Sequence, residues 1–244
     1  AQVQSVMPTG LVMNADDLRR TMRPKSRYYP APSLVCVENT HNGAGGVVSS
    51  IASLRAIGDV AAERGLPVHI DGARLWNASV ASGASLAEIA DCGRTVMVAF
   101  SKGLGAPIGA ALAGSAQDIE TAWTARKLFG GAMRQAGILA AAVLYALDNH
   151  MDRLVEDHDN AKLIAGIVDG AGGATVVKPD TNIVMIDLPS GRTAAPVVAA
   201  LKAQGVLVAE WSDTRIRTVT HLDVSASDCR RAAEALREEL ERVA

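Results

Sequence analysis

The sequence predicts an α/β protein in which a mostly parallel sheet carries helices on both faces, followed by a smaller α+β domain. Stretches with strand and helix patterns alternate along the first part of the chain, as in βαβ units. A turn cluster at residues 170–173 then precedes shorter elements of mixed type. We assign residues 1–150 to the large domain and residues 151–244 to the small one.

The first elements follow from apolar spacing. Residues 33–38 form an apolar run that predicts a buried strand, and residues 51–65 have helical spacing that ends at Gly65. Residues 67–70 predict a second strand, which ends at Asp71, and residues 72–81 predict a helix or helical turn.

The middle of the chain opens with a capping box, in which Ser85 and Glu88 start a short helix. Residues 95–100 then predict a buried strand, and residues 108–113 predict another strand of small residues. Helices are expected over residues 116–167.

In the small domain we expect a strand at 182–186, a helix at 194–204 and a strand at 215–224. The last helix shows an apolar face made of Cys229, Ala232, Ala233, Leu236, Leu240 and Val243. At the other end, residues 1–10 are expected to form a strand and a turn.

Composition excludes several classes of partner. The 24 basic and 26 acidic residues are mixed along the chain and give a net charge of -2, so a surface for nucleic acid or anionic membranes is not expected. The longest apolar stretch, residues 137–147, is too short to span a bilayer. Cys36, Cys92 and Cys229 lack metal-ligand spacing, and we expect reduced cysteines of a cytoplasmic protein that binds a small molecule and no metal.

Lys102 is the main candidate for covalent chemistry, because it follows the predicted strand at 95–100 in a glycine-rich turn. Burial favours the neutral, nucleophilic amine, which suits a Schiff base with an aldehyde cofactor. Asp71 ends a neighbouring strand, so both side chains are expected at the carboxyl edge of the sheet. Pyridoxal phosphate (PLP) needs such a pair, but a capping aspartate and a surface lysine also fit the pattern.

Several long motifs share one order along the chain. They are Glu38-Asn39-Thr40-His41-Asn42, His69-Ile70-Asp71-Gly72-Ala73-Arg74-Leu75-Trp76-Asn77-Ala78, Ser101-Lys102-Gly103-Leu104-Gly105-Ala106-Pro107, Gly130-Gly131-Ala132-Met133-Arg134-Gln135 and Arg217-Thr218-Val219-Thr220-His221-Leu222-Asp223-Val224. Together they resemble the L-threonine aldolase family over essentially the whole chain.

This resemblance implies a PLP-dependent transferase-like fold of type I, in which residues 1–150 are an incomplete PLP-binding domain. It implies a lyase that cleaves L-threonine or related β-hydroxy-α-amino acids to glycine and an aldehyde. It also implies a homo-oligomer, either a dimer or a tetramer, because the family's sites lie at subunit interfaces.

Carried over by motif, the resemblance makes Lys102 the Schiff-base lysine and Asp71 the partner of the pyridine nitrogen. Arg74 is expected near the cofactor and the substrate carboxylate, with a surface ion pair as the alternative. Arg217 is expected to bind that carboxylate, and Arg215, on the same strand face, is the solvent-facing alternative.

Lys127 and Arg134 flank the Gly130-Gly131 pair, and the resemblance suggests that they contact the cofactor phosphate. A solvated helix face explains them equally well. His41 is expected to shape the loop beside the cofactor.

The chain departs from the family at two places. Tyr28 stands where the family usually has a histidine that meets the substrate hydroxyl; a tyrosine can hydrogen-bond a hydroxyl but is a poor base near neutral pH. The family also has roughly a hundred further residues before the point that matches Ala1, including a phosphate loop and a ring-stacking histidine. Two alternatives therefore remain: another amino-acid lyase, for phenylserine-like substrates, or a truncated non-catalytic remnant.

Overall fold

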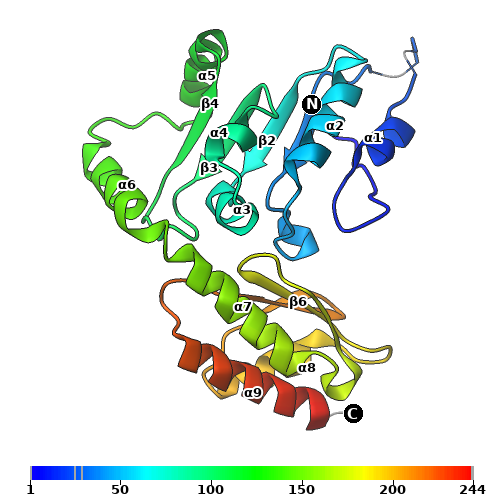
Figure 1. The fold of residues 1–244 in the computed structure, drawn as a ribbon, viewed down its shortest axis with the longest axis vertical. Coiled ribbons are helices and arrows are strands. Elements are labelled where there is room, and N and C mark those ends of the chain that lie inside the picture. Colours follow the sequence, from blue (N-terminus) through cyan, green and yellow to red (C-terminus); the bar gives the residue numbers. More distant parts are fainter. Residues whose placement is uncertain (1, 25, 29, 243–244) are drawn as a thin grey trace. The chain divides into compact units, whose positions relative to one another are not determined.

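The computed structural model describes residues 2–24, 26–28 and 30–242. The chain forms two compact units, drawn in Figure 1. The first comprises Ala1–His41 and Val48–Met151, and the second comprises Asn42–Val47 and Asp152–Ala244. The short segment Asn42–Val47 thus groups with the second unit, although its place in the sequence is within the larger predicted domain.

The first unit is built on a four-stranded sheet in the order β1-β2-β3-β4. β1 (Val35–Glu38), β2 (Val68–Gly72) and β3 (Thr95–Ala99) are parallel, and β4 (Ala110–Gly114) pairs antiparallel with β3. The prediction of a mostly parallel sheet is confirmed.

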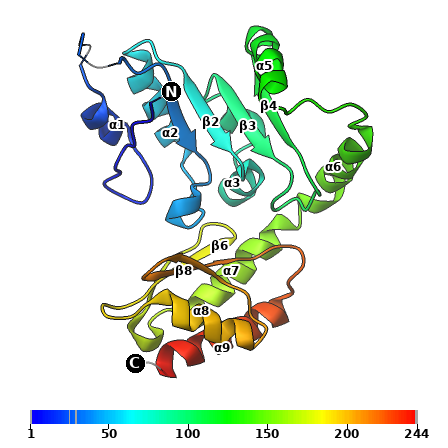
Figure 2. The same ribbon diagram turned by 180° about the vertical axis from the view of Figure 1, so that it is seen from behind.

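Helices connect and cover these strands. In Figure 1, α2 and α4 lie in front of the sheet, and the view from behind in Figure 2 shows the strands in front of α2. Ser85 and Glu88 form the predicted capping box at the start of α4. The helices of this unit after the first strand are α2 (Ile51–Ala62), α3 (Leu75–Ser82), α4 (Leu86–Ala90), α5 (Ala116–Leu128) and α6 (Gly137–His150).

One face of the sheet is more deeply buried than the other. The core beneath the helices includes Val35, Val37, Val68, Ile70 and Val96. On the opposite face Cys36 is exposed, and His69 and Thr95 are half-buried, with their Nδ1 and Oγ1 atoms 2.8 Å apart. The strand at Thr95–Ala99 is therefore less buried than the sequence predicts.

The amino-terminal region differs from the prediction. Residues 2–10 form no strand, so the strand expected at residues 1–10 is wrong for this described part; Ala1 lies outside the described residues. Instead, α1 (Ala15–Thr21) follows, with Asn14 and Asp17 forming a capping box. That pair was the available sequence signal for this short helix.

The second unit contains an antiparallel sheet in the order β5-β6-β8-β7. β6 (Ile183–Asp187) and β8 (Arg215–Val219) were predicted, although β8 ends before the expected Val224. β5 (Thr175–Val177) and β7 (Ala209–Ser212) were not predicted.

Three helices pack on this sheet: α7 (Leu154–Val168), α8 (Ala194–Ala203) and α9 (Ala226–Arg242). The apolar face predicted for α9 is confirmed, since Cys229, Ala233, Leu236 and Leu240 are buried and Ala232 is half-buried. Val243 lies outside the described residues. Among the described residues, no helix combines the length and apolar character needed to cross a membrane.

His158 gives the second unit a testable pH dependence. Burial in α7 lowers the pKa of its imidazole from the ordinary 6.5 to about 4, and the charge of Lys162 acts in the same direction. As the pH falls below 6.5, the unfolded chain therefore binds a proton that the folded chain does not. We expect the free energy of unfolding to fall by about 2 kcal/mol more between pH 7 and pH 5 in the parent than in His158→Gln.

Denaturant titrations of both proteins at the two pH values measure this difference. Other titrating groups contribute equally to the pH dependence of both proteins, so their contribution cancels in the comparison. One of them is the buried Asp157, because burial raises the pKa of its carboxyl. Equal pH dependence in the two proteins would contradict the assignment.

Candidate functional site

Lys102 lies in a tight turn just after β3. The turn is closed by a hydrogen bond from the Gly105 N–H to the Lys102 carbonyl (2.8 Å), and Gly105 takes a left-handed conformation with φ 71°. Leu104 is fully buried, and Nδ1 of His150 donates to its carbonyl (2.6 Å). The backbone of the turn is therefore anchored, while the Lys102 side chain itself is exposed.

The end of β3 is held against α3 through Trp76. Its indole Nε1–H donates to the Ala99 carbonyl (2.8 Å), and its ring stacks on Phe100 with 5.7 Å between centroids. Trp76 is buried, so this hydrogen bond satisfies a donor that would be costly to leave unpaired. These contacts set where the chain leaves the sheet before it reaches Lys102.

Asp71 lies near the end of β2, where it is paired in register with Glu38 of β1 and Met97 of β3. Its Oδ1 accepts the N–H of Ala73 (3.1 Å). Gly72 allows the close approach of strands here, because a Cβ on it would lie 2.6 Å from the Met97 carbonyl oxygen. The half-buried carboxylate is thus placed at the carboxyl edge of the sheet, as predicted from the sequence.

Three charged side chains lie close enough to Lys102 to affect the pKa of its amine. Partial loss of hydration lowers the pKa of the Lys102 ammonium, and the charge of Arg74 lowers it further, while Asp71 and Glu38 act in the opposite direction. The side chain as a whole is exposed, and its ammonium loses its proton at a lower pH than an ordinary lysine does. Arg74 occupies the N-cap position of α3 and is half-buried.

The loop after β1 is tied down by Asn39. Its side chain donates to the Ser49 carbonyl (3.3 Å) and accepts the Ser49 N–H (3.1 Å). Nε2 of His41 lies 3.8 Å from Oε2 of Glu38. These contacts hold the segment after β1, and the loop-shaping role of His41 stays a prediction.

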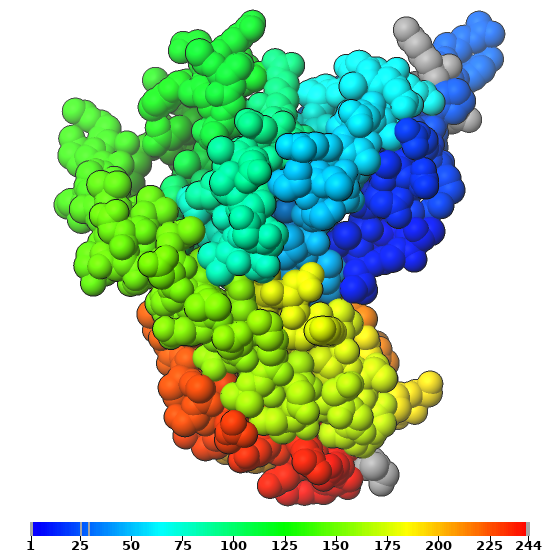
Figure 3. Space-filling view, in the orientation of Figure 1, coloured from blue at the N-terminus to red at the C-terminus, as the bar shows by residue number. Residues whose placement is uncertain are grey.

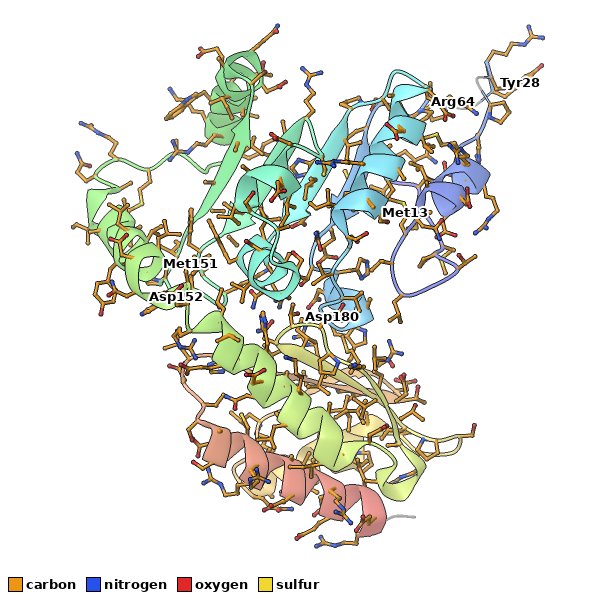
Figure 4. All side chains as sticks on the ribbon, in the orientation of Figure 1. Met13, Tyr28, Arg64, Met151, Asp152 and Asp180 are labelled. Carbon is orange, nitrogen blue, oxygen red and sulfur yellow. The ribbon has the colours of Figure 1, made fainter. Side chains whose placement is uncertain are left out.

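The remaining candidates of the first unit are not among the charges that act on Lys102. Lys127 lies in the last turn of α5 and Arg134 in the segment before α6, and both are exposed. Tyr28 is 76% exposed, with the Arg27 guanidinium 5.3 Å from its ring centroid. Figure 4 shows it at the outer margin of this unit.

Arg217, the candidate of the second unit, has no carboxylate partner among the described residues. Its Nη1 donates to Oδ1 of Asn42 (3.1 Å), its guanidinium carbon lies 4.9 Å from the ring centroid of Trp211, and its Nε is buried without a hydrogen bond. Arg215, in contrast, forms a two-point ion pair with Asp187, with Nη2 and Oδ2 2.7 Å apart. The unpaired charge distinguishes Arg217 as the better anion-binding candidate.

Sequence reasoning did not single out Trp211. The only available signal was its position in the segment before β8, since β7 itself was not predicted. Asn42 stood inside a quoted motif, but its contact with Arg217 joins residues far apart in the sequence and could not be read from spacing.

The first unit therefore presents a lysine with a lowered pKa beside a carboxylate and an arginine. These residues fit an aldehyde cofactor with a basic ring nitrogen: the amine can attach the aldehyde and the carboxylate can hold a proton on the ring. Within the described ranges, no cluster of three or more histidine, cysteine or acidic side chains is arranged to hold a metal ion.

Comparisons with known proteins agree with this chemistry. Residues 1–190 match the family model described as beta-eliminating lyase. The chain is 40% identical over 207 residues to low-specificity L-threonine aldolase 1 of Arabidopsis thaliana, covering 83% of this chain and 58% of that protein. It is also 40% identical over 210 residues to the low specificity L-threonine aldolase of Escherichia coli K12, covering 86% of this chain and 61% of that protein.

Solved structures show the fold. Threonine aldolase of Leishmania major superposes with a TM-score of 0.75 at 20% identity, covering 94% of this chain and 68% of that one. An archaeal alanine:glyoxylate aminotransferase gives a TM-score of 0.70 at 18% identity, covering 94% and 61%. The fold is thus the expected fold-type I, while the chain spans about three fifths of the length of the curated relatives described above.

The charges around Lys102 make opposite predictions for two variants. Arg74→Gln removes a positive charge and is expected to raise the pKa of Lys102, whereas Asp71→Asn removes a negative charge and is expected to lower it. The rate at which an amine-selective reagent labels Lys102, followed by mass spectrometry over a range of pH, measures both shifts.

Arg126→Gln is the matched control, because the Arg126 charge is not among those that act on Lys102. A pKa of Lys102 that moves in the same direction in Arg74→Gln and Asp71→Asn would disprove the electrostatic grouping.

Proposed function

The chain belongs to the beta-eliminating lyase family, and on this basis we propose that it cleaves L-threonine or related β-hydroxy-α-amino acids to glycine and an aldehyde, with PLP as cofactor. The observation that carries the proposal is the placement of Lys102, in the turn after β3, and of Asp71, near the end of the neighbouring β2, at one edge of the sheet. The threonine aldolase names of the relatives support the choice of substrate.

The proposed cofactor contacts divide by chemistry. The neutral amine of Lys102 would attach the aldehyde, and the carboxylate of Asp71 would keep the ring nitrogen protonated. Lys127 and Arg134 would supply positive charge for the phosphate. When bound, PLP supplies an electron sink that stabilises the charge left when the Cα–Cβ bond breaks.

Substrate orientation would depend on the arginines. Arg74 and Arg217 would bind the carboxylate of the amino acid, a task that suits the planar guanidinium because it can donate two parallel hydrogen bonds. The absence of a carboxylate partner for Arg217 among the described residues supports this role. Tyr28 is not part of this arrangement, because it lies exposed at the outer margin of the first unit.

The attachment role of Lys102 is tested by Lys102→Ala. With PLP added, the parent chain is expected to show the visible absorbance of lysine-bound cofactor and to release glycine from threonine, and the variant is expected to lose both. Absorbance spectra and a glycine-release assay with threonine, allo-threonine and phenylserine measure this and rank the substrates.

Lys202→Ala is the matched control, since Lys202 is an exposed lysine in the last turn of α8. Turnover that persists in Lys102→Ala would refute the assignment. A parent chain that does not bind PLP would refute the catalytic proposal for this chain and favour the non-catalytic alternative.

We also propose that the chain is a cytoplasmic homo-oligomer. Its three cysteines are all free, which suits a reducing compartment. In α6, Ile138, Leu144 and Tyr145 are 83%, 61% and 62% exposed, an unusual state for large apolar side chains. Figure 3 shows α5 and α6, in green, at the outer edge of the first unit. A second copy covering α6 would bury these side chains.

The pair of substitutions Ile138→Glu and Leu144→Glu is expected to shift the protein toward the monomer, because it places charges in the proposed contact. Size-exclusion chromatography with light scattering measures the mass. Leu207→Glu is the control, since Leu207 is 80% exposed in the second unit. A parent chain that is monomeric at all concentrations would contradict the proposal.

A further inference from the structure

Trp211 occupies an irregular position in the second sheet. β7 and β8 are in register at Glu210 and Ile216, and the register then shifts so that Ser212 lies opposite Arg215. Trp211 is the residue left between these pairs, which makes it the extra residue of a β-bulge. Bulges redirect side chains and are common beside functional sites.

The bulge residue meets Arg217. The guanidinium carbon of Arg217 lies 4.9 Å from the centroid of the Trp211 ring, within the range of a cation–π interaction. Ala209, the register partner of Arg217 on β7, is too small to support the guanidinium itself. The guanidinium of Arg217 therefore packs against the indole ring of Trp211.

An aromatic face has a property that a carboxylate partner lacks. It stabilises the cation from above or below the guanidinium plane, so it uses none of the N–H groups that lie in that plane. Asp187 does the reverse for Arg215, because it accepts from Nε and Nη2 and neutralises the charge. The charge of Arg215 is therefore balanced by a carboxylate, whereas no carboxylate among the described residues balances the charge of Arg217.

Asn42 completes the arrangement. Its Oδ1 accepts from Nη1 of Arg217 (3.1 Å), which fixes the rotation of the guanidinium within its plane. Nη2 makes no hydrogen bond to the described residues. The ring and the amide together hold the guanidinium in place and leave Nη2 as a donor for a carboxylate.

We propose that Trp211 is a positioning residue that holds the Arg217 guanidinium in its carboxylate-binding orientation. This inference rests on the proposed role of Arg217 in binding the substrate carboxylate. Trp211 contributes through the π face of its ring, so an aliphatic side chain does not replace it, whereas another aromatic ring does.

The test uses 3-hydroxybutyrate, which carries the carboxylate and hydroxyl of threonine but has no amine to react with PLP. The full chain is titrated with this probe, and the NMR signal of the Arg217 Nε–H, assigned by its loss in Arg217→Lys, reports binding. We expect the Kd to rise about threefold or more in Trp211→Leu and to stay within about twofold of the parent in Trp211→Phe.

Trp123→Leu is the matched control, because the Arg126 guanidinium lies at the same 4.9 Å from the Trp123 ring but belongs to the first unit. Its Kd is expected to equal that of the parent. A Kd in Trp211→Leu equal to that of the parent overturns the inference. If the probe leaves the parent's Arg217 signal unchanged, the carboxylate role of Arg217 fails first, and the inference fails with it.

Should Trp211→Leu not fold, fluorinated tryptophan incorporated into the parent chain gives the second measurement. Fluorine weakens the negative face of the ring at nearly constant volume, so the Kd is expected to rise without loss of folding. An unchanged Kd in the fluorinated protein overturns the inference.

Discussion

The parallel register of β1, β2 and β3 is the constraint on which the candidate site depends. It places Glu38 opposite Asp71 and Asp71 opposite Met97, so that neighbouring strands end at one edge. The absence of a Cβ at Gly72 permits this spacing, because the Met97 carbonyl oxygen occupies the space that a Cβ would need. Once the strands are aligned, the turn that carries Lys102 follows β3 at the edge of the sheet where these carboxylates lie.

The candidate cations of the two units have different neighbours. In the first, Arg74 lies close enough to Lys102 to disfavour a second cation, which leaves the amine more nucleophilic. In the second, Arg217 keeps its charge because its neighbours are an aromatic ring and an amide. Lys102 thus has both carboxylates and an arginine near it, whereas Arg217 has no carboxylate partner among the described residues.

The sequence predicted those parts of the fold that carry strong local patterns. Apolar runs located β1, β2 and β3, and the Ser85 capping box located α4. The short strands β5 and β7 were not predicted, because so few residues do not show a recognisable alternation of apolar and polar side chains. Strand ends and motifs predicted that Lys102 and Asp71 lie at one edge of the sheet. The contact between Trp211 and Arg217 could not be predicted from the sequence. A strict alternation of side chains along a strand assumes a constant register, and the β-bulge at Trp211 shifts that register.

The anchored turn after β3 has a consequence for conformational entropy. The Gly105 N–H and His150 fix the backbone around Lys102 when the chain folds, so the ordering of that backbone is complete before any ligand arrives. Attachment of a ligand to the amine then restricts only the rotatable bonds of the lysine side chain, at a cost of up to about 2 kcal/mol. A lysine on a loop without these hydrogen bonds would add about 1 to 2 kcal/mol for every backbone residue ordered on binding.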